Sequence, residues 1–218
     1  MTVAAVILSA SPAGSLALAD GVARVRRLVD VAWAGGAIPI VVVAADPDGA
    51  VAAALAGSEA VLRPPADPAA GPVGQMAMGI ATAIAAIRET DAVLLWPARL
   101  CWVDAETVTS LIEAHGADPG PVLRPAYGGE AGWPALLPVG HLAALTAVGP
   151  ALMPPAILDA LAASGIEVRP IEVGDPGVVV DADTPRAGLP AFDGPPGPTS
   201  GVHHEWGATA ADRSEAGH

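Results

Sequence analysis

Short runs of apolar residues alternate along this chain with longer segments of helical character. The strongest runs lie at 3–10, 38–45 and 91–96. A strand that is covered on both faces has a nearly continuous apolar sequence, whereas a half-buried strand alternates between apolar and polar residues. Strands of the first kind that alternate with helices form a mostly parallel sheet with helices on both faces. The sequence therefore predicts an α/β protein built as a three-layer sandwich.

The remaining elements have weaker patterns. Their spacing predicts helices at 17–34, 75–88, 104–115 and 154–164, and shorter strands at 60–62, 121–126, 135–137, 167–173 and 177–180. From about Pro190 the composition shifts to glycine, proline, serine, threonine, aspartate and histidine, with almost no core-forming residues. We therefore expect one domain over 1–189 and a flexible tail over 190–218.

Composition and charge exclude several classes of function. Hydrophobic residues make up 52% of the chain, and 23 acidic against 10 basic residues give a formal net charge of −13. This balance argues against nucleic-acid binding and against attachment to an anionic membrane, because both need a basic face. All the basic residues are arginines, so chemistry that needs a lysine amine is excluded. The longest apolar stretches, 38–45 and 77–87, are shorter than the ~20 residues of a spanning helix, and we expect a cytoplasmic protein.

Ligands of parallel α/β sheets bind at the carboxyl ends of the strands, which directs attention to three junctions. The first, 8–15, is rich in small residues whose backbone N–H groups could accept a phosphate. It matches neither the Walker nor the GxGxxG pattern, and an ordinary turn is the alternative. The second junction is 94–100. The third, 178–185, contains Asp181 and Asp183, which either share a divalent cation or cap the following turn.

Taken in order, four segments resemble the motifs of the MobA-like nucleotidyltransferases, a family that includes the molybdenum-cofactor cytidylyl- and guanylyltransferases. The segments are 8–11, 97–99, 128–134 and 181–185, and the last, Asp-Ala-Asp-Thr-Pro, is similar to the Asp-x-Asp-Thr-Pro that closes the family pattern. The resemblance covers roughly residues 3 to 188. It implies a Rossmann-like, GT-A-like nucleotidyltransferase fold with a mostly parallel sheet.

The resemblance also implies roles for individual residues. The implied nucleotide-binding residues are Ser9, Ala10, Ser11, Gly74, Gln75 and Arg99, and the implied substrate-side residues are Gly129, Trp133 and Pro134. Asp181 and Asp183 are the implied ligands of a Mg²⁺ ion. No residue stands out as the catalytic group.

Several departures from the family pattern bear on activity. The family's first loop is glycine-rich and reaches a lysine that neutralises the triphosphate, whereas this chain has Ser11 at the glycine position and no lysine. The loop is also several residues short before a helix expected around Asp20-Gly21. The aspartate that the family uses for Mg²⁺ aligns with Arg99, and the family's histidine before proline aligns with Trp133.

These departures predict a loss of catalytic power. Nucleotidyl transfer depends on positioning and on charge neutralisation, and the loss of one preorganised contact costs about 3–4 kcal/mol of barrier. We therefore expect weak Mg²⁺ binding and a catalytically eroded protein that binds a nucleotide or a protein partner as an accessory or assembly factor. The family alone links such a factor to molybdenum-cofactor enzymes. The alternatives are a divergent but active Mg²⁺-dependent nucleotidyltransferase and a structural subunit that has retained only the fold.

Other conspicuous residues have structural explanations. Four tryptophans are expected in the core or at a pocket rim, and they are Trp33, Trp96, Trp102 and Trp133. The single Cys101, which permits no intramolecular disulfide, is expected to be buried. Three arginines, Arg24, Arg26 and Arg27, are expected on the solvated face of a helix. The histidines of the tail are not expected to form a dedicated metal site, because a tail lacks the surrounding groups that orient ligands.

Overall fold

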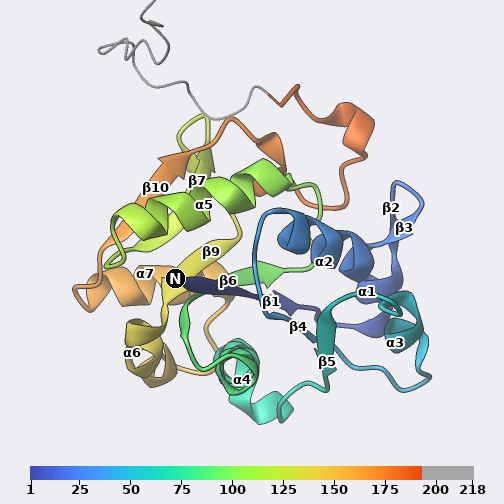
Figure 1. Cartoon of the computed structure of the whole chain (residues 1–218), viewed down its shortest axis with the longest axis horizontal. Coiled ribbons are helices and arrows are strands. Elements are labelled where there is room, and N and C mark those ends of the chain that lie inside the picture. The colour runs from blue at the N-terminus through green and yellow to red at the C-terminus, as the bar shows by residue number, and fades with distance from the viewer. Residues whose placement is uncertain (193–218) are drawn as a thin grey trace, which may run out of the picture.

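A sheet with helices on both faces makes up residues 1–192, the part of the chain that the computed structural model describes (Figure 1). The predicted tail, from 193 onward, lies outside the described residues. The strands of the main sheet are β1 (Thr2–Leu8), β4 (Ile40–Val43), β5 (Ala60–Arg63), β6 (Thr90–Pro97), β7 (Val122–Tyr127), β8 (Glu130–Ala131), β9 (Ala135–Pro138) and β10 (Val168–Glu172). The helices are α1 (Pro12–Leu16), α2 (Arg24–Ala34), α3 (Ala50–Ala54), α4 (Gly71–Ala86), α5 (Ala105–Ala117), α6 (Leu142–Ala147) and α7 (Pro154–Ala163).

The sheet is mostly parallel, as the apolar runs predict. Its order is β10-β7-β9-β6-β1-β4-β5, and β8 pairs with β7. The pairs β1–β4, β1–β6, β4–β5 and β7–β10 are parallel, and β9 is antiparallel to β6 and to β7. The chain adds β4 on one side of β1 and β6 on the other. The carboxyl ends of β1 and β6 therefore form a topological switch point, where open α/β sheets bind ligands.

Helices form the two outer layers (Figure 1). One face of the sheet carries α2 and α5, which pack against each other, and the other face carries α4, α6 and α7. In α4, Gly79 lies so close to β1 that a Cβ atom built on it would be 2.3 Å from Cγ1 of Val6. This close approach holds the helix against the central strand.

The segment that contains α4 is both long and apolar. Within the described residues, Pro68–Ala86 is long and apolar enough to cross a membrane by length and composition alone, with a mean hydropathy of 1.3. The apolar run 77–87 is shorter than this segment, because the first part of the segment also contains proline, glycine and Gln75. In this fold α4 lies against β1 and β4 and contributes Met76 and Ile80 to the core.

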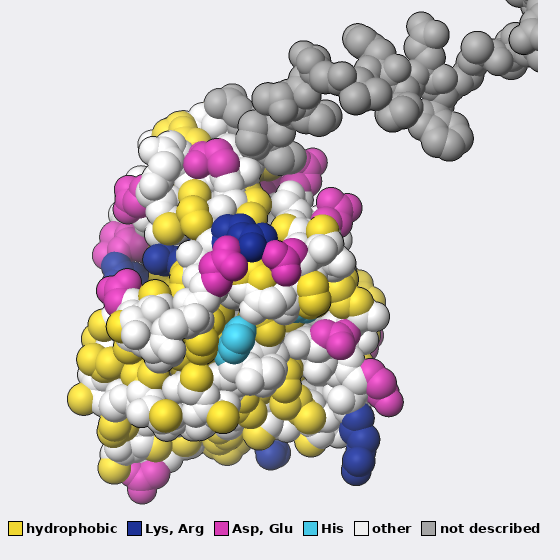
Figure 2. All heavy atoms as spheres, turned by 90° about the vertical axis from the view of Figure 1, so that its left-hand side faces the viewer, with side chains coloured by type: hydrophobic (Ala, Val, Ile, Leu, Met, Phe, Trp, Pro, Cys, Tyr) yellow, Lys and Arg dark blue, Asp and Glu magenta, His cyan; other side chains and the backbone are white. Residues whose placement is uncertain are grey.

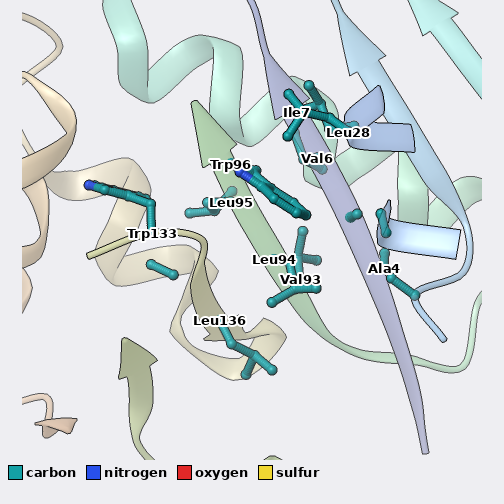
Figure 3. Close-up of a cluster of buried hydrophobic side chains, with 14 of the residues drawn as sticks. Ala4, Val6, Ile7, Leu28, Val93, Leu94, Leu95, Trp96, Trp133 and Leu136 are labelled. Carbon is teal, nitrogen blue, oxygen red and sulfur yellow. The ribbon is translucent and has the colours of Figure 1, made fainter. Parts of the chain in front are cut away.

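The core is centred on β1 and β6, the two neighbouring strands at the switch point (Figure 3). Trp96 of β6 is opposite Ile7 of β1 in the register and is fully buried near Leu28 of α2. Its indole Nε1 donates a 2.9 Å hydrogen bond to the backbone carbonyl of Leu100. The same ring therefore fills the core and fixes the loop that follows β6.

Two element predictions are wrong. The helix predicted at 17–34 begins only at Arg24, because a two-stranded hairpin of β2 (Leu18–Ala19) and β3 (Val22–Ala23) precedes it. The hairpin turns at Asp20-Gly21, where both residues have positive φ angles of 52° and 78°. An Asp-Gly pair is a typical sequence for such a turn, and no helix forms around it.

The strand predicted at 177–180 is also absent, because 176–178 forms a 3₁₀ turn. The carboxylate of Asp175 accepts a hydrogen bond from the backbone N–H of Gly177 and starts this turn. A Cβ atom on Gly177 would lie 2.4 Å from the backbone of Trp102, so the turn packs tightly beside the loop that follows β6. This contact was not visible from local sequence.

Candidate functional site

Three loops meet at the carboxyl ends of β1 and β6. The backbone N–H of Ala98 donates a 2.8 Å hydrogen bond to the carbonyl of Leu8, which joins the end of β6 to the end of β1. The N–H of Ala182 donates a 2.8 Å hydrogen bond to the carbonyl of Arg99, which joins the third predicted junction to the second. The structure therefore brings the loops of all three junctions to one edge of the sheet.

The first loop is held by its own hydroxyl groups. Ser11 is the N-cap of α1, and its Oγ accepts a 3.1 Å hydrogen bond from the N–H of Gly14. The buried Ser15 donates a 2.6 Å hydrogen bond to Oγ of Ser9. Ala10, which lies between Ser9 and Ser11, is exposed. Hydrogen bonds of the serine hydroxyl groups thus stabilise a compact turn. The backbone N–H of Gly14, one of the groups predicted to bind a phosphate, is already bonded to Ser11.

Arg99 and Asp181, which the sequence places in separate motifs, form an ion pair between Nη2 and Oδ2. The second carboxylate oxygen of Asp181 accepts a 3.0 Å hydrogen bond from the N–H of Asp183. The guanidinium of Arg99 and this amide both stabilise the ionised carboxylate, so the pKa of Asp181 is lowered from its usual value. The Arg99 side chain is 67% exposed and that of Asp181 is 25% exposed.

The residues at this edge do not fit the Mg²⁺ ion that the family implies. A divalent hard cation prefers several oxygen ligands, and within residues 1–192 no group of three or more His, Cys, Asp or Glu side chains is placed to hold one. Of the two predicted ligands, Asp181 already has both oxygens engaged. The exposed Asp183 is the remaining carboxylate, and the positive charge of Arg99 lies against Asp181.

Two arginines that were expected on a solvated helix face are instead turned toward the site. Arg27 donates a 2.8 Å hydrogen bond from Nε to the carbonyl of Cys101, and its guanidinium lies 5.5 Å from the ring centroid of Trp102. Arg24 has Nη2 3.5 Å from the carbonyl oxygen of Ala182. Of the three arginines, Arg26 alone makes a local pair on the helix surface, with Asp30. The Asp-Gly turn was the signal that places Arg24 at the start of the helix.

Cys101 and Trp102 behave largely as expected. Cys101 is fully buried, and burial, opposed by the charges of Arg24 and Arg27, raises the pKa of its thiol. Trp102 is 8% exposed and donates a 2.9 Å hydrogen bond from Nε1 to the carbonyl of Thr184. The loop after β6 is therefore tied to the Asp-Ala-Asp-Thr-Pro segment by a second bond.

Gly74 and Gln75, predicted at the nucleotide, have structural contacts at the start of α4. The side-chain amide of Gln75 accepts a 2.7 Å hydrogen bond from the N–H of Ala66 and donates a 3.1 Å bond to the carbonyl of the same residue. A Cβ atom on Gly74 would lie 2.3 Å from that of Ala70. Gln75 thus holds the loop between β5 and α4 by hydrogen bonds, and Gly74 allows Ala70 of that loop to pack closely against the helix.

The substrate-side residues surround the β7–β8 turn. The carboxylate of Glu172 accepts hydrogen bonds of 2.8 Å and 3.3 Å from the N–H groups of Gly128 and Gly129. Trp133 is buried, and its N–H donates a 2.9 Å bond to the carbonyl of Val178, three residues before Asp181. Pro134 follows it and leads into β9. Of these residues, Trp133 therefore holds the segment that leads to Asp181.

Comparison with known proteins agrees with this architecture. Residues 14–164 match the profile of the family described as the MobA-like NTP transferase domain. No curated protein matches the chain. Among solved structures, a nucleotidyl transferase from Methanothermobacter thermautotroptrophicus is similar with a TM-score of 0.67 and 18% identity over 84% of this chain and 92% of that one.

Two further structures have the same fold. Rv0371c from Mycobacterium tuberculosis H37Rv, in a complex with manganese, has a TM-score of 0.63 and 16% identity over 79% of this chain and 89% of that one. CMP:2-keto-3-deoxy-manno-octonic acid synthetase, in a complex with CTP, has a TM-score of 0.61 and 14% identity over 79% of this chain and 90% of that one. At these identities the likeness establishes the nucleotidyltransferase-type fold.

Proposed function

Because this chain belongs to the MobA-like NTP transferase family, we propose that it binds a nucleotide through the nucleotidyltransferase fold without transferring it. In this proposal it is a binding or accessory factor with an eroded catalytic site, and the cytoplasm is its compartment. The first partners to test are molybdenum-cofactor enzymes, on the strength of the family alone. The ligand enters at the switch point between β1 and β6.

The ion pair between Arg99 and Asp181 is the observation that supports this proposal. By resemblance, Arg99 occupies the place of one metal-binding aspartate and Asp181 the place of another. A guanidinium donates hydrogen bonds and cannot ligate a cation. Transfer of a nucleotidyl group relies on charge neutralisation by a metal ion and a lysine, and this chain contains no lysine. The chain therefore retains the scaffold but lacks the charges that lower the barrier.

Calorimetric titration of the full chain with CTP and with GTP tests the proposal. Each titration is run once in Mg²⁺ and once in EDTA. We expect the two dissociation constants to agree within about twofold, because Asp181 is neutralised by Arg99 and not by a metal ion. A micromolar Mn²⁺ site that disappears in Asp183→Ala would contradict the proposal.

A pyrophosphate-release assay with the same nucleotides and with molybdenum cofactor as the nucleotidyl acceptor separates binding from transfer. We expect no turnover near ordinary enzyme rates, and release at about 1 s⁻¹ or faster would establish an active enzyme. That outcome would support the alternative of a divergent transferase, which is favoured by the exposed carboxylate of Asp183 and by the manganese in the Rv0371c complex.

A chain that binds no nucleotide in either medium would support the structural-subunit alternative. Figure 2 shows that hydrophobic side chains cover much of the lower part of one face, while most acidic side chains lie in its upper part. The large hydrophobic side chains that are exposed in residues 1–192 come from separate elements, and they are Met1, Leu18, Val22, Trp33, Ile38, Val61, Met153 and Phe192. Sedimentation or light scattering of the nucleotide-free chain would then show whether the chain associates with itself.

A further inference from the structure

The guanidinium of Arg24, near the site, lacks good hydrogen-bond acceptors. It is the first residue of α2, directly after the β2–β3 hairpin. Its Nε is buried and has no hydrogen-bond partner among the described residues. Its Nη2 lies 3.5 Å from the carbonyl oxygen of Ala182, at the outer limit of a hydrogen bond. An unpaired buried donor of a charged group costs free energy, and a better acceptor at Nη2 would stabilise the guanidinium.

The surroundings of Arg24 add to this cost. The N-terminus of a helix carries partial positive charge, so a cation there is unfavourable unless an anion accompanies it. The first turn of α2 contains no acidic residue. None of the ion pairs formed within residues 1–192 includes Arg24. The local charge is therefore poorly compensated by the protein itself.

Arg24 and Arg99 approach the same short segment from two sides. The N–H of Ala182 is bonded to the carbonyl of Arg99, and the carbonyl of Ala182 faces the guanidinium of Arg24. The neighbouring Asp181 is paired with Arg99, and the charge of Arg24 also acts on its carboxylate. The carboxylate of Asp181 is thus paired with Arg99, and the guanidinium of Arg24 lies near it without forming an ion pair.

We propose that Arg24 and Arg99 together bind a phosphate group of the ligand directly, without a metal ion. The proposal rests on nucleotide binding for the identity of the natural ligand, but the anion site itself stands on the arginines. Guanidinium groups present two N–H donors in a plane that matches two phosphate oxygens. The phosphate displaces Asp181 from Arg99 and accepts from Nη2 of Arg24, whose 3.5 Å contact with Ala182 is at the outer limit of a hydrogen bond.

Titration with inorganic pyrophosphate in EDTA tests the site independently of the nucleotide. We expect Arg24→Gln to weaken pyrophosphate binding about tenfold or more, since a hydrogen bond to a charged group is lost. Arg26→Gln is the matched control, because Arg26 lies in the same turn of α2 but is paired with Asp30. Its binding constant is expected to stay within about twofold of the unmodified chain.

Asp181→Asn gives a test in the opposite direction and does not depend on how well Arg24→Gln folds. Removing the carboxylate frees Arg99 and takes a negative charge away from Arg24, so pyrophosphate should bind several-fold more tightly in EDTA. With Mg²⁺ in place of EDTA, a metal-ligating Asp181 predicts weaker binding by Asp181→Asn instead. Weaker or unchanged binding by Asp181→Asn in EDTA overturns the two-arginine site.

The outcomes separate this inference from the proposed function. Pyrophosphate binding that depends on Arg24, with no binding of CTP or GTP, supports the anion site and contradicts nucleotide binding. Nucleotide binding that is equal in the Arg24→Gln and Arg26→Gln proteins overturns the anion site and leaves the proposed function standing. Absence of binding by pyrophosphate and by both nucleotides overturns both.

Discussion

Arg99 and Asp181 neutralise each other at an exposed edge of the molecule, and their exposure limits what the pair adds to stability. With Arg99 two-thirds exposed, the pair resembles surface ion pairs that contribute about 0–1 kcal/mol to folding. Its importance lies in charge placement. A positive side chain fixed beside Asp181 repels a divalent cation and attracts an anion.

Replacement of Arg99 by aspartate tests that placement. Arg99→Asp puts a second carboxylate opposite Asp181, so the metal-free variant should lose stability through repulsion. Mg²⁺ at about ten times its dissociation constant should then restore about 1.4 kcal/mol by mass action. Catalysis should not return, because the chain has no lysine to hold the triphosphate.

The measurement is the melting temperature with and without Mg²⁺. Arg99→Ala is the control, since it removes the guanidinium without adding a carboxylate and should be indifferent to the ion. An Arg99→Asp protein that is equally indifferent would mean that Arg99 does not occupy the metal position.

His115 makes stability depend on pH. The imidazole is 1% exposed on α5, and neither ring nitrogen has a hydrogen-bond partner among the described residues. Burial lowers the pKa of His115, although the carboxylates of Asp91 and Asp118 oppose the shift. The folded state therefore binds fewer protons than the unfolded state below about pH 6.5, and stability should fall as the pH drops through that value.

Urea unfolding between pH 7.5 and 5.5 measures this slope. His115→Met removes the titrating group and the unpaired nitrogens, so it should flatten the dependence and leave stability at pH 7.5 unchanged or higher. An equally steep slope in His115→Met would assign the dependence to another group.

At the scale of elements, strand positions could be predicted because buried strands need continuous apolar sequence. The run 91–96 corresponds to β6, and the helix predicted at 104–115 corresponds to α5, whose N-cap is Asp104. The start of α2 was missed because amphipathic spacing continues across the Asp20-Gly21 turn, whose positive φ angles forbid a helix. The turn at 176–178 depends on Asp175 and on the packed backbone of Trp102, which no local pattern reveals.

The packing of α4 on β1 provides an element-scale prediction. Gly79→Ala would place a Cβ atom 2.3 Å from Val6 in the middle of the sheet, where the backbone has little room to move. Overpacking of this kind costs about 1–3 kcal/mol. Gly116→Ala on α5 is the control, because its Cβ would meet only the flexible end of Met1 at 3.2 Å.

Chemical denaturation of both variants makes the comparison. Gly116→Ala should be neutral or stabilising by up to about 1 kcal/mol, since alanine is the better helix former. Equal stability of the two variants would show that α4 shifts to accommodate the extra methyl group.

At the scale of the whole molecule, the place of the site could be predicted from topology alone. Parallel strands bring their carboxyl ends to one edge, and the ends of β1 and β6 meet there. The pairing of Arg99 with Asp181 and the inward turn of Arg24 could not be predicted, because they depend on contacts between segments that are far apart in sequence. Similarly, the hydrogen bonds that Gly128 and Gly129 donate to Glu172 form only once β7 and β10 pair.

Removal of 190–218 tests the predicted domain boundary. The segment contains almost no core-forming residues, so a chain that ends at Leu189 should keep its melting temperature within about 2 °C. A chain that ends at Pro185 is the comparison. It also loses Arg186, whose 3.0 Å ion pair with Asp20 ties the hairpin to this end of the domain, and it should melt lower. A larger drop in the first chain would place the boundary beyond 189.

The pairing of Asp181 with Arg99 also makes the carboxylate a tethered competitor of any anion that approaches from solution. Dilution does not lower the local concentration of a tethered group. The apparent dissociation constant of an outside anion is therefore its intrinsic value divided by the fraction of molecules in which Asp181 has released Arg99. Because added salt weakens the internal pair and the external contact alike, the two effects oppose each other. We therefore expect the affinity of the proposed anion site to vary less with ionic strength than it would without Asp181.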